Sequence, residues 1–201
     1  MALVAVFVFS TTAMAQTKWA YQSNYSEGMA CVKNDQGKWG HVDEQGNQVG
    51  QMWRNVKYFQ DGLAPVETQD EKWGFVDKTG KLVIPCQYFN VHWFSEGLAA
   101  VSISADYRIK YGYIAKTGKV VIPCQWEYAY NFDEGLAYVK DENGKYGFID
   151  KTGKVVIPCK WKDAWPFSEG MAKVRDDNGK YGFIDKTGNL VIPCKWKDAK
   201  S

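Results

Sequence analysis

One unit of about thirty-five residues is copied five times along this chain, and this repetition constrains the fold more than any other feature. An acidic residue followed by glycine recurs, with the glycine at Gly28, Gly62, Gly97, Gly135 and Gly170. A second glycine follows an aromatic residue at Gly40, Gly74, Gly112, Gly147 and Gly182. The third copy carries extra residues near Ser104 to Ile109. Repetition at such a period is the signature of a solenoid, a propeller or another stacked array.

Each unit is predicted to form antiparallel β-structure. In the copy that begins at Gly135, a strand over 136–139 leads through Asp-Glu-Asn-Gly, a strong hairpin signal, into 145–149. A second turn at 150–153 leads into 155–159, and a less regular piece at 161–167 joins the next copy. Small apolar residues alternate with variable ones, as in Ala137 and Val139, which indicates a half-buried strand. The expected fold is all-β, with about three strands per unit stacked as an open, solenoid-like array; a five-bladed β-propeller is the alternative.

The first fifteen residues resemble a secretory signal peptide. An apolar run, Ala2 to Phe9, precedes Ala13-Met14-Ala15, which supplies small residues for cleavage, although no Lys or Arg comes before the run. We expect a mature domain over 16–201, with repeats at 19–53, 54–87, 88–125, 126–160 and 161–195 and a partial unit at 196–201. The chain is then exported, to the periplasm or the cell surface. A net charge of +2, spread along the chain, excludes a basic nucleic-acid stripe, and we expect no transmembrane segment in the mature chain.

The repeated residues carry a family resemblance. F-S-E-G-[LM]-A-x-V, K-[WY]-G-[FY]-[IV]-D-x-T-G and V-I-P recur in register from Trp19 to Ala199. This pattern resembles the WG repeat (also called the KWG repeat) of bacterial proteins. The resemblance implies repeated β-structure in proteins that are often exported, and it supplies no catalytic residues. The first copy departs most, with His41 where others have Phe or Tyr and Met52 in the place of the recurring cysteine, as expected of a terminal repeat.

Four cysteines share one position of the unit: Cys86, Cys124, Cys159 and Cys194. Their spacing lacks the close pairs of a zinc site, and a position that also accepts Met is apolar. We expect buried thiols, with disulfides between neighbouring units as the alternative in an exported protein. Cys31 stands at a variable position and is expected to be an exposed thiol. No metal or cofactor is expected.

The glycine after the aromatic residue needs a structural reason, because glycine weakens a strand. We expect close approach of the neighbouring unit there. The acidic residues beside the turn glycines recur in every copy, such as Glu96 and Asp150. Because catalytic groups are usually singular, we expect these acids to cap N–H groups of their own turns.

Tryptophans outside the recurring positions are the candidate contacts. The recurring Trp126, Trp161 and Trp196 are expected in the core, whereas the candidate partner or glycan contacts are Trp53, Trp93, Trp165 and, in the extra residues of the third copy, Tyr107. Periodicity without a singular polar cluster predicts a non-enzymatic binding scaffold for a protein or envelope partner. A glycan- or peptidoglycan-binding module with aromatic platforms is the alternative, and an enzyme is the third.

Overall fold

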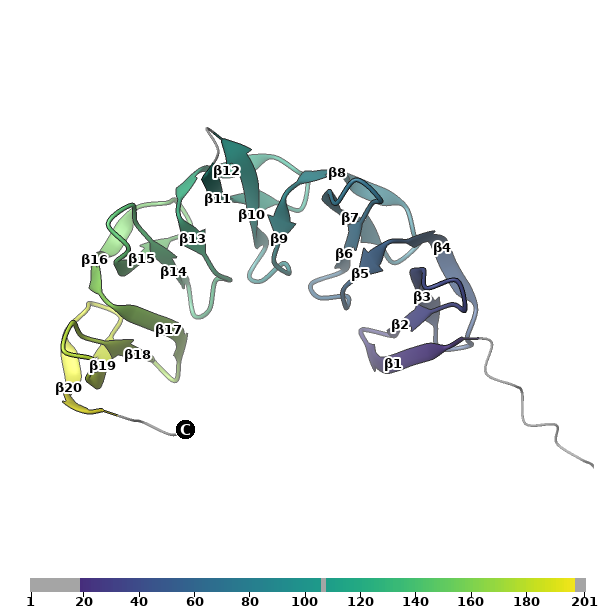
Figure 1. The fold of residues 1–201 in the computed structure, drawn as a ribbon. Helices are drawn as coiled ribbons and strands as arrows, with labels where there is room; N and C mark the ends of the chain where they lie inside the picture. Colours follow the sequence, from purple (N-terminus) through teal and green to yellow (C-terminus); the bar gives the residue numbers. More distant parts are fainter. Residues whose placement is uncertain (1–18, 106–107, 198–201) are drawn as a thin grey trace, which may run out of the picture.

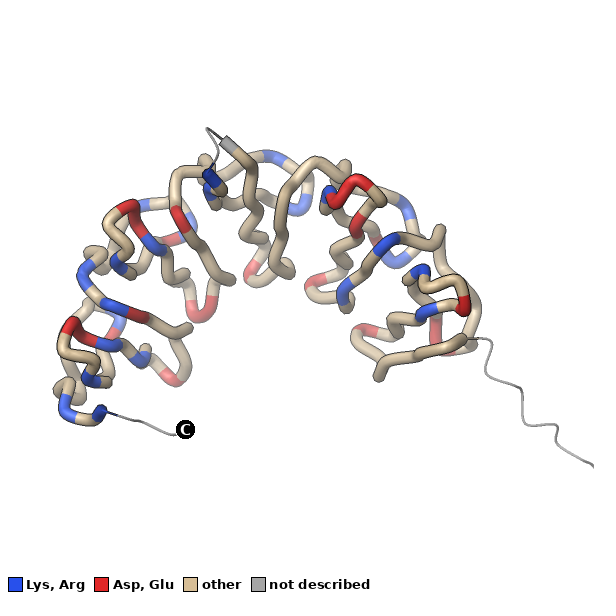
Figure 2. Tube along the Cα trace, in the orientation of Figure 1, with Lys and Arg blue, Asp and Glu red and all other residues tan. Residues whose placement is uncertain are grey.

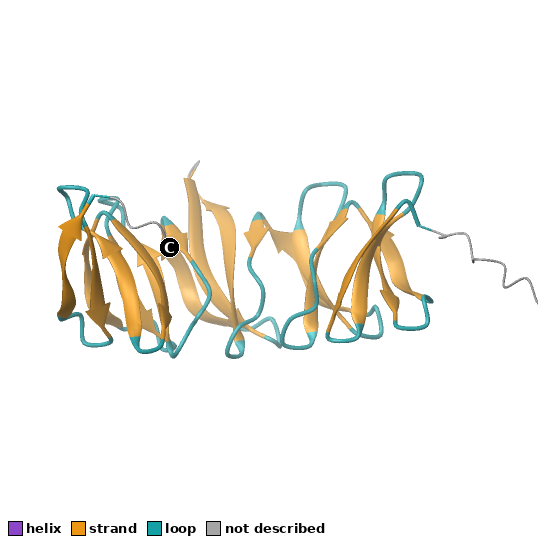
Figure 3. Cartoon of the chain, turned by 90° about the horizontal axis from the view of Figure 1, so that it is seen from below, coloured by secondary structure: helices purple, strands orange, loops and turns teal. Residues whose placement is uncertain are grey.

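A computed structural model describes residues 19–105 and 108–197, which form an open arc of five four-stranded sheets (Figure 1). Within each sheet the strands pair antiparallel with their neighbours in chain order. The first and fifth sheets lie at opposite ends of the arc (Figure 1). Seen from below, the strands of the successive sheets lie side by side in one row (Figure 3). The predicted all-β repeat array is therefore confirmed, in its open form. No helix of the described residues is long and apolar enough to cross a membrane.

The strand bounds follow the repeat. The first sheet contains β1 (Tyr21–Ser26), β2 (Met29–Lys33), β3 (Trp39–Asp43) and β4 (Gln48–Trp53). The second contains β5 (Asn55–Val56), β6 (Leu63–Glu67), β7 (Trp73–Asp77) and β8 (Leu82–Tyr88). The third contains β9 (Asn90–Val91), β10 (Leu98–Ala105), β11 (Arg108–Ala115) and β12 (Val120–Trp126). The fourth contains β13 (Tyr128–Ala129), β14 (Leu136–Lys140), β15 (Tyr146–Asp150) and β16 (Val155–Trp161). The fifth contains β17 (Asp163–Ser168), β18 (Met171–Arg175), β19 (Tyr181–Asp185) and β20 (Leu190–Trp196).

The less regular piece of each unit is a strand, so the sheets have four strands rather than about three. It is short in the middle sheets, where β13 pairs with β14 only through Tyr128↔Lys140 and Ala129↔Val139. A two-residue strand is too short to show an alternating pattern. This strand begins the next sheet, and it carries the chain to the concave side of the arc (Figure 1).

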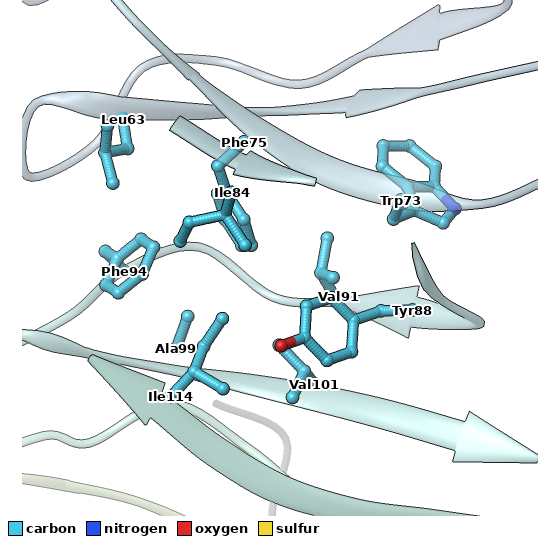
Figure 4. Close-up of a cluster of buried hydrophobic side chains, with 10 residues drawn as sticks. All are labelled: Leu63, Trp73, Phe75, Ile84, Tyr88, Val91, Phe94, Ala99, Val101 and Ile114. Atoms are coloured by element: carbon cyan, nitrogen blue, oxygen red, sulfur yellow. The ribbon is translucent and has the colours of Figure 1, made fainter. Parts of the chain in front are cut away.

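The sheets bury their faces against one another. Each has an Ala/Val face, named for the small residues of its second strand, and an aromatic face on the opposite side, which carries a ring from its third strand. Between the second and third sheets, Phe75, Ile84 and Tyr88 of one aromatic face meet Ala99 and Val101 of the next Ala/Val face (Figure 4). The same arrangement recurs at each of the four interfaces. Burial of apolar area at these interfaces holds the array together.

The glycine after the aromatic residue is required by close approach within its own sheet, not by the neighbouring unit as expected. A Cβ on Gly112 would stand 2.4 Å from the Ile122 oxygen and 2.7 Å from the Cys124 nitrogen. Both atoms belong to β12, the paired strand, whose register with β11 shifts at this point. The glycine therefore lets the fourth strand cross tightly at a bulge.

The cysteines are all free thiols. The four recurring cysteines are half-buried, and Cys86, Cys124, Cys159 and Cys194 contact the apolar clusters between sheets or beside them. Cys31 is 5% exposed, so the expectation of an exposed thiol was wrong. Its position lies on the aromatic face of the first sheet, and the second sheet covers it. This burial raises the pKa of the Cys31 thiol to about 11, against a weaker opposing hydrogen bond with Ser23.

Candidate functional site

The predicted contact residues divide between the core and the surface. Trp53 is 7% exposed and packs between the first two sheets, so its assignment as a contact was wrong. Trp53 pairs with Trp39 in the way that Trp161 pairs with Tyr146, and it therefore belongs to the recurring position. Trp93 and Trp165 are half-buried. Tyr107 lies outside the described residues.

Trp93 lines a groove on the concave side of the arc. The groove has a volume of about 410 Å³, and its walls come from three successive sheets. They are Asn24, Tyr25 and Ser26 of the first, Tyr58, Phe59 and Gln60 of the second, and Trp93 of the third. Tyr25 and Tyr58 are 45% and 43% exposed. Three aromatic residues with amide and hydroxyl groups beside them thus line one open space.

Hydrogen bonds fix the walls of this groove. The Ser26 hydroxyl donates to the Phe59 carbonyl oxygen at 2.8 Å, which joins the first sheet to the second. The Tyr25 hydroxyl donates to the Asp43 carbonyl oxygen at 3.3 Å. Aromatic rings that combine an apolar face with polar neighbours suit amphipathic ligands such as sugars or peptide side chains.

A half-buried lysine contacts the Trp93 ring. The Lys57 ammonium lies 5.2 Å from the centre of the Trp93 ring and 4.8 Å from that of Trp73. It also donates to the Val91 carbonyl oxygen at 2.7 Å. Burial lowers the pKa of Lys57, and the charge of Glu67 opposes that shift. The Lys57 ammonium thus contacts the faces of both tryptophan rings and a backbone carbonyl at once.

Acidic residues link each sheet to the next along the concave edge, where the red segments of Figure 2 recur. Glu96 of the third sheet accepts a hydrogen bond from the Gly135 nitrogen at 3.2 Å and pairs with Lys151 at 2.9 Å, both in the fourth sheet. Glu27, Asp61 and Glu134 make the equivalent contacts to Lys78, Lys116 and Lys186. Partial burial raises the pKa of Glu96, but the bonds from Lys151 and Gly135 outweigh it, and the net shift is downward.

We call these four contacts between successive sheets the acid–lysine ladder. For these acids the expectation of local turn capping was wrong, and for the second acidic series it was right. The acids that precede the turn glycines reach the next sheet rather than their own turn. The second acidic series does cap its own turn, as expected: the Asp150 carboxylate accepts hydrogen bonds from the Thr152 nitrogen at 2.9 Å and the Lys154 nitrogen at 3.1 Å. The hydroxyl of Thr152 also donates to it, and this bond is the main cause of its lowered pKa.

The two histidines are packed rings. His41 is 2% exposed, and its Nε2 lies 3.0 Å from the Lys57 carbonyl oxygen in the second sheet. Burial lowers the pKa of His41 despite that bond. The ring centre of His92 is 5.2 Å from that of Tyr130, and burial, with help from the Lys57 charge, lowers its pKa to about 4. Both rings are therefore neutral at pH 7.

The extra residues of the third copy lengthen the β10–β11 hairpin. Beside it lies a second hollow of about 540 Å³, lined by Arg108, Ile109, Glu127, Lys140, Asp141, Glu142 and Gly144. Lys110 pairs with Glu127 at 2.7 Å here. Mixed charges that already pair with one another make this hollow a weaker candidate for a ligand than the aromatic groove.

Sequence reasoning missed two groove residues, Tyr25 and Tyr58. Tyr58 precedes Phe59 as Trp93 precedes Phe94, at a position occupied by Asn131 in the fourth sheet. Because the residue at this aligned position differs between copies, the sequence could have identified Tyr58 as a candidate contact. Tyr25 aligns with Phe59 through its pairing with β2, and only the terminal place of its sheet leaves the ring exposed.

Comparisons with known proteins bear on the repeat and on the fold. A family described as "WG containing repeat" matches residues 73–104, 111–146, 146–181 and 181–201. These matches begin in the second sheet. No curated protein sequence matches the chain.

Among solved structures, the computationally designed Ika8 protein is similar with a TM-score of 0.54 and 13% identity. The alignment covers 84% of this chain and 59% of Ika8, so this chain spans about three fifths of that protein. BamB from Moraxella catarrhalis aligns with a TM-score of 0.49 and 10% identity, over 85% of this chain and 58% of BamB. The WD40 β-propeller domain of Doa1 aligns at 0.44 and 13%, over 85% and 66%. The Ika8 likeness supports the fold alone.

Proposed function

Because this chain belongs to the WG-containing repeat family, whose pattern matches most of it, we propose that it is a non-enzymatic binding scaffold. The proposed setting is the bacterial envelope or the extracellular space, reached through the signal at residues 1–15. The scaffold presents the concave side of its arc to a protein or envelope partner.

The observation that carries this proposal is the concave groove. Two of its aromatic walls, Tyr58 and Trp93, use a position that varies between copies, whereas the positions that hold the sheets together repeat. Tyr58 and Trp93 therefore stand where a repeat array differs from sheet to sheet, on the face that curvature turns toward a common ligand. An exposed aromatic cluster with a polar rim is typical of interaction sites.

Crosslinking tests the scaffold directly. A photo-reactive amino acid would replace Tyr58 in the groove or Val156, which is 37% exposed on β16 of the fourth sheet, in cells that produce the full chain. We expect a discrete adduct from position 58 and none from position 156. Equal labelling from both positions would contradict a groove-directed partner. Mass spectrometry of the same material checks export, which requires the chain to begin at Gln16.

A glycan is the second candidate ligand, because the groove volume of about 410 Å³ lies in the range of small-molecule sites and its rings offer stacking faces. Purified protein from Gln16 to Ser201 would be mixed with insoluble peptidoglycan, and its depletion from the supernatant measured by absorbance. Trp93→Ala should abolish depletion, and Trp165→Ala should preserve it. Trp165 is the matched control because Lys173 lies 4.4 Å from its ring centre, far along the arc from the groove. If wild-type protein is not depleted, the glycan candidate fails and the protein scaffold remains.

A further inference from the structure

The exposed aromatic face of the fifth sheet repeats the surface that the other sheets bury. At each interior interface, a ring of the third strand meets a phenylalanine of the next sheet at nearly one distance. The pairs are His41–Phe59 at 4.8 Å, Phe75–Phe94 at 4.9 Å, Tyr113–Phe132 at 4.8 Å and Phe148–Phe167 at 4.9 Å. The fifth member of this series is Phe183. It is half-buried, whereas Phe148 is fully buried.

Two further contacts of the interface are open on the same face. A Cβ on Gly188 would stand 3.2 Å from the side chain of Ile157, so this isoleucine of the fourth sheet rests on the backbone of the fifth. Its counterpart Ile192 is only half-buried. Trp161 is 6% exposed because the fifth sheet covers it, and its counterpart Trp196 is 48% exposed. The Trp196 ring is thus exposed at the position where Trp161 packs against the next sheet.

The acid–lysine ladder also stops at this face. Glu169 holds φ at 52°, as Glu96 and Glu134 do. Those two acids accept a glycine N–H and pair with a lysine from the following sheet. No following sheet exists for Glu169 within residues 19–105 and 108–197, yet its backbone keeps the same left-handed conformation at the end of the array. That backbone conformation is the one from which Glu96 and Glu134 receive a lysine and a backbone N–H.

The opposite end of the array does not complement this face. In the first sheet, Glu44 stands where the other sheets carry Lys78, Lys116, Lys151 or Lys186. A second copy docked in the repeating mode would therefore place Glu44 against Glu169, and like charges repel. Trp19 further covers Ala30, Val32 and Val42, the small residues that would have to receive Trp196.

We propose that the aromatic face of the fifth sheet docks a four-stranded sheet of the same repeat type from a different polypeptide. The partner's sheet presents small Ala and Val residues to Trp196, a phenylalanine to Phe183, and a lysine from its Asp-Lys-Thr-Gly turn to Glu169. The interface continues the heterologous, head-to-tail stacking of the array. It lies on the end of the arc and is separate from the concave groove.

The test supplies such a partner by altering the first sheet of this chain. The variant Trp19→Ala/Glu44→Lys/Glu169→Gln uncovers the small residues, provides the missing lysine, and removes the acid at its own far end. Mixed with wild-type protein, it should form a complex that stops at one molecule of each in sedimentation velocity. The complex stops there because the wild-type first sheet keeps Trp19 and Glu44. Wild-type protein alone should remain monomeric.

Controls separate docking from non-specific association. Using Glu169→Gln protein in place of wild type should weaken the complex by about two- to fivefold, since a partly exposed ion pair is lost. Glu134→Gln, one interface inward, should leave the complex unchanged. If the triple variant fails to fold by circular dichroism, Trp19→Val replaces Trp19→Ala in it, because a smaller apolar side chain at position 19 still uncovers part of the receiving face. A mixture that stays monomeric, or one that binds equally well without Glu169, overturns the proposal.

Discussion

Adding one methyl group at Gly112 should destabilise the third sheet by more than glycine's backbone freedom alone can explain. The Cβ of Gly112→Ala would stand 2.4 Å from the Ile122 oxygen, and β12 would have to move until that contact exceeds about 3.0 Å. The clash is with backbone, which cannot rotate away. Ile122 also rests on Gly153 of the fourth sheet, so the displacement would reach the next interface.

The expected cost is about 3 kcal/mol, the upper end of the range for forced overpacking of a filled interior. The matched control is Gly118→Ala in the same sheet. Gly118 has φ of +81°, but the nearest atom to its added Cβ is a carbon of the Ile84 side chain at 3.7 Å. Gly118→Ala therefore carries only the left-handed backbone penalty of about 1 kcal/mol.

Hydrogen exchange of the β11 and β12 amides measures the difference, because a repeat array need not unfold as one unit and local opening energies are then the relevant quantity. Opening of the third sheet should become easier in Gly112→Ala by at least about 1 kcal/mol relative to Gly118→Ala. Equal protection in the two variants would refute the argument, because it would mean that conformational freedom, not close approach of β12, explains the glycine.

Three further changes test other contacts. Glu96 has a lowered pKa in the folded state, so its contribution to stability exists above the unfolded pKa near 4.5 and is lost as the pH falls. Glu96→Gln should lower the free energy of unfolding by less than about 1 kcal/mol at pH 7. It should also reduce the loss of that free energy between pH 7 and pH 3, measured by urea titration at both pH values. His41 also has a lowered pKa in the folded state, so stability is highest above the unfolded pKa of 6.5 and falls below it, because the unfolded ring protonates more readily. His41→Tyr should remove the pH dependence of stability between pH 6.5 and 5. An unchanged pH profile of stability would contradict this prediction. Cys31, with a pKa of about 11, should resist alkylation at pH 8 in native protein and react in urea, whereas equal rates in both would show that it is not buried.

The array and its strand positions could be predicted because the copies can be compared within one chain. Positions such as Ala137 and Val139 keep small apolar residues while their neighbour Tyr138 varies, and that alternation marks the buried face without any structure. The two-residue strands could not be predicted, because pairing such as Ala129↔Val139 depends on where the chain travels after Trp126. Local pattern carries no information about that path.

The candidate site was predicted only in part, for reasons of register and distance. Trp53 was not recognised as a recurring residue because β4 is one residue shorter than β8. The partner of Trp39 in β4 therefore comes one residue earlier than the partner of Trp73 in β8. Trp93 was identified as non-recurring and does line the groove. The partners of Glu96 lie in the following sheet. Its sequence pattern fits a cap of its own turn equally well, so the sequence alone cannot distinguish a contact with the next sheet from a local cap. Residues far apart in sequence meet only after the sheets stack.

The acid–lysine ladder is better understood as a device for geometry than for stability. Each acid before a turn glycine is held at positive φ, from 51° at Glu27 to 57° at Asp61, which costs about 1 kcal/mol for a residue with a side chain. The ion pair it forms is partly exposed, and such pairs contribute about 0.2 to 1 kcal/mol. The two terms nearly cancel, so glycine would serve the turn as well. What glycine lacks is a carboxylate that fixes how far one sheet can slide and rotate on the next. Since the groove at Tyr25, Tyr58 and Trp93 spans three sheets, its shape depends on that fixed spacing more than on any single wall.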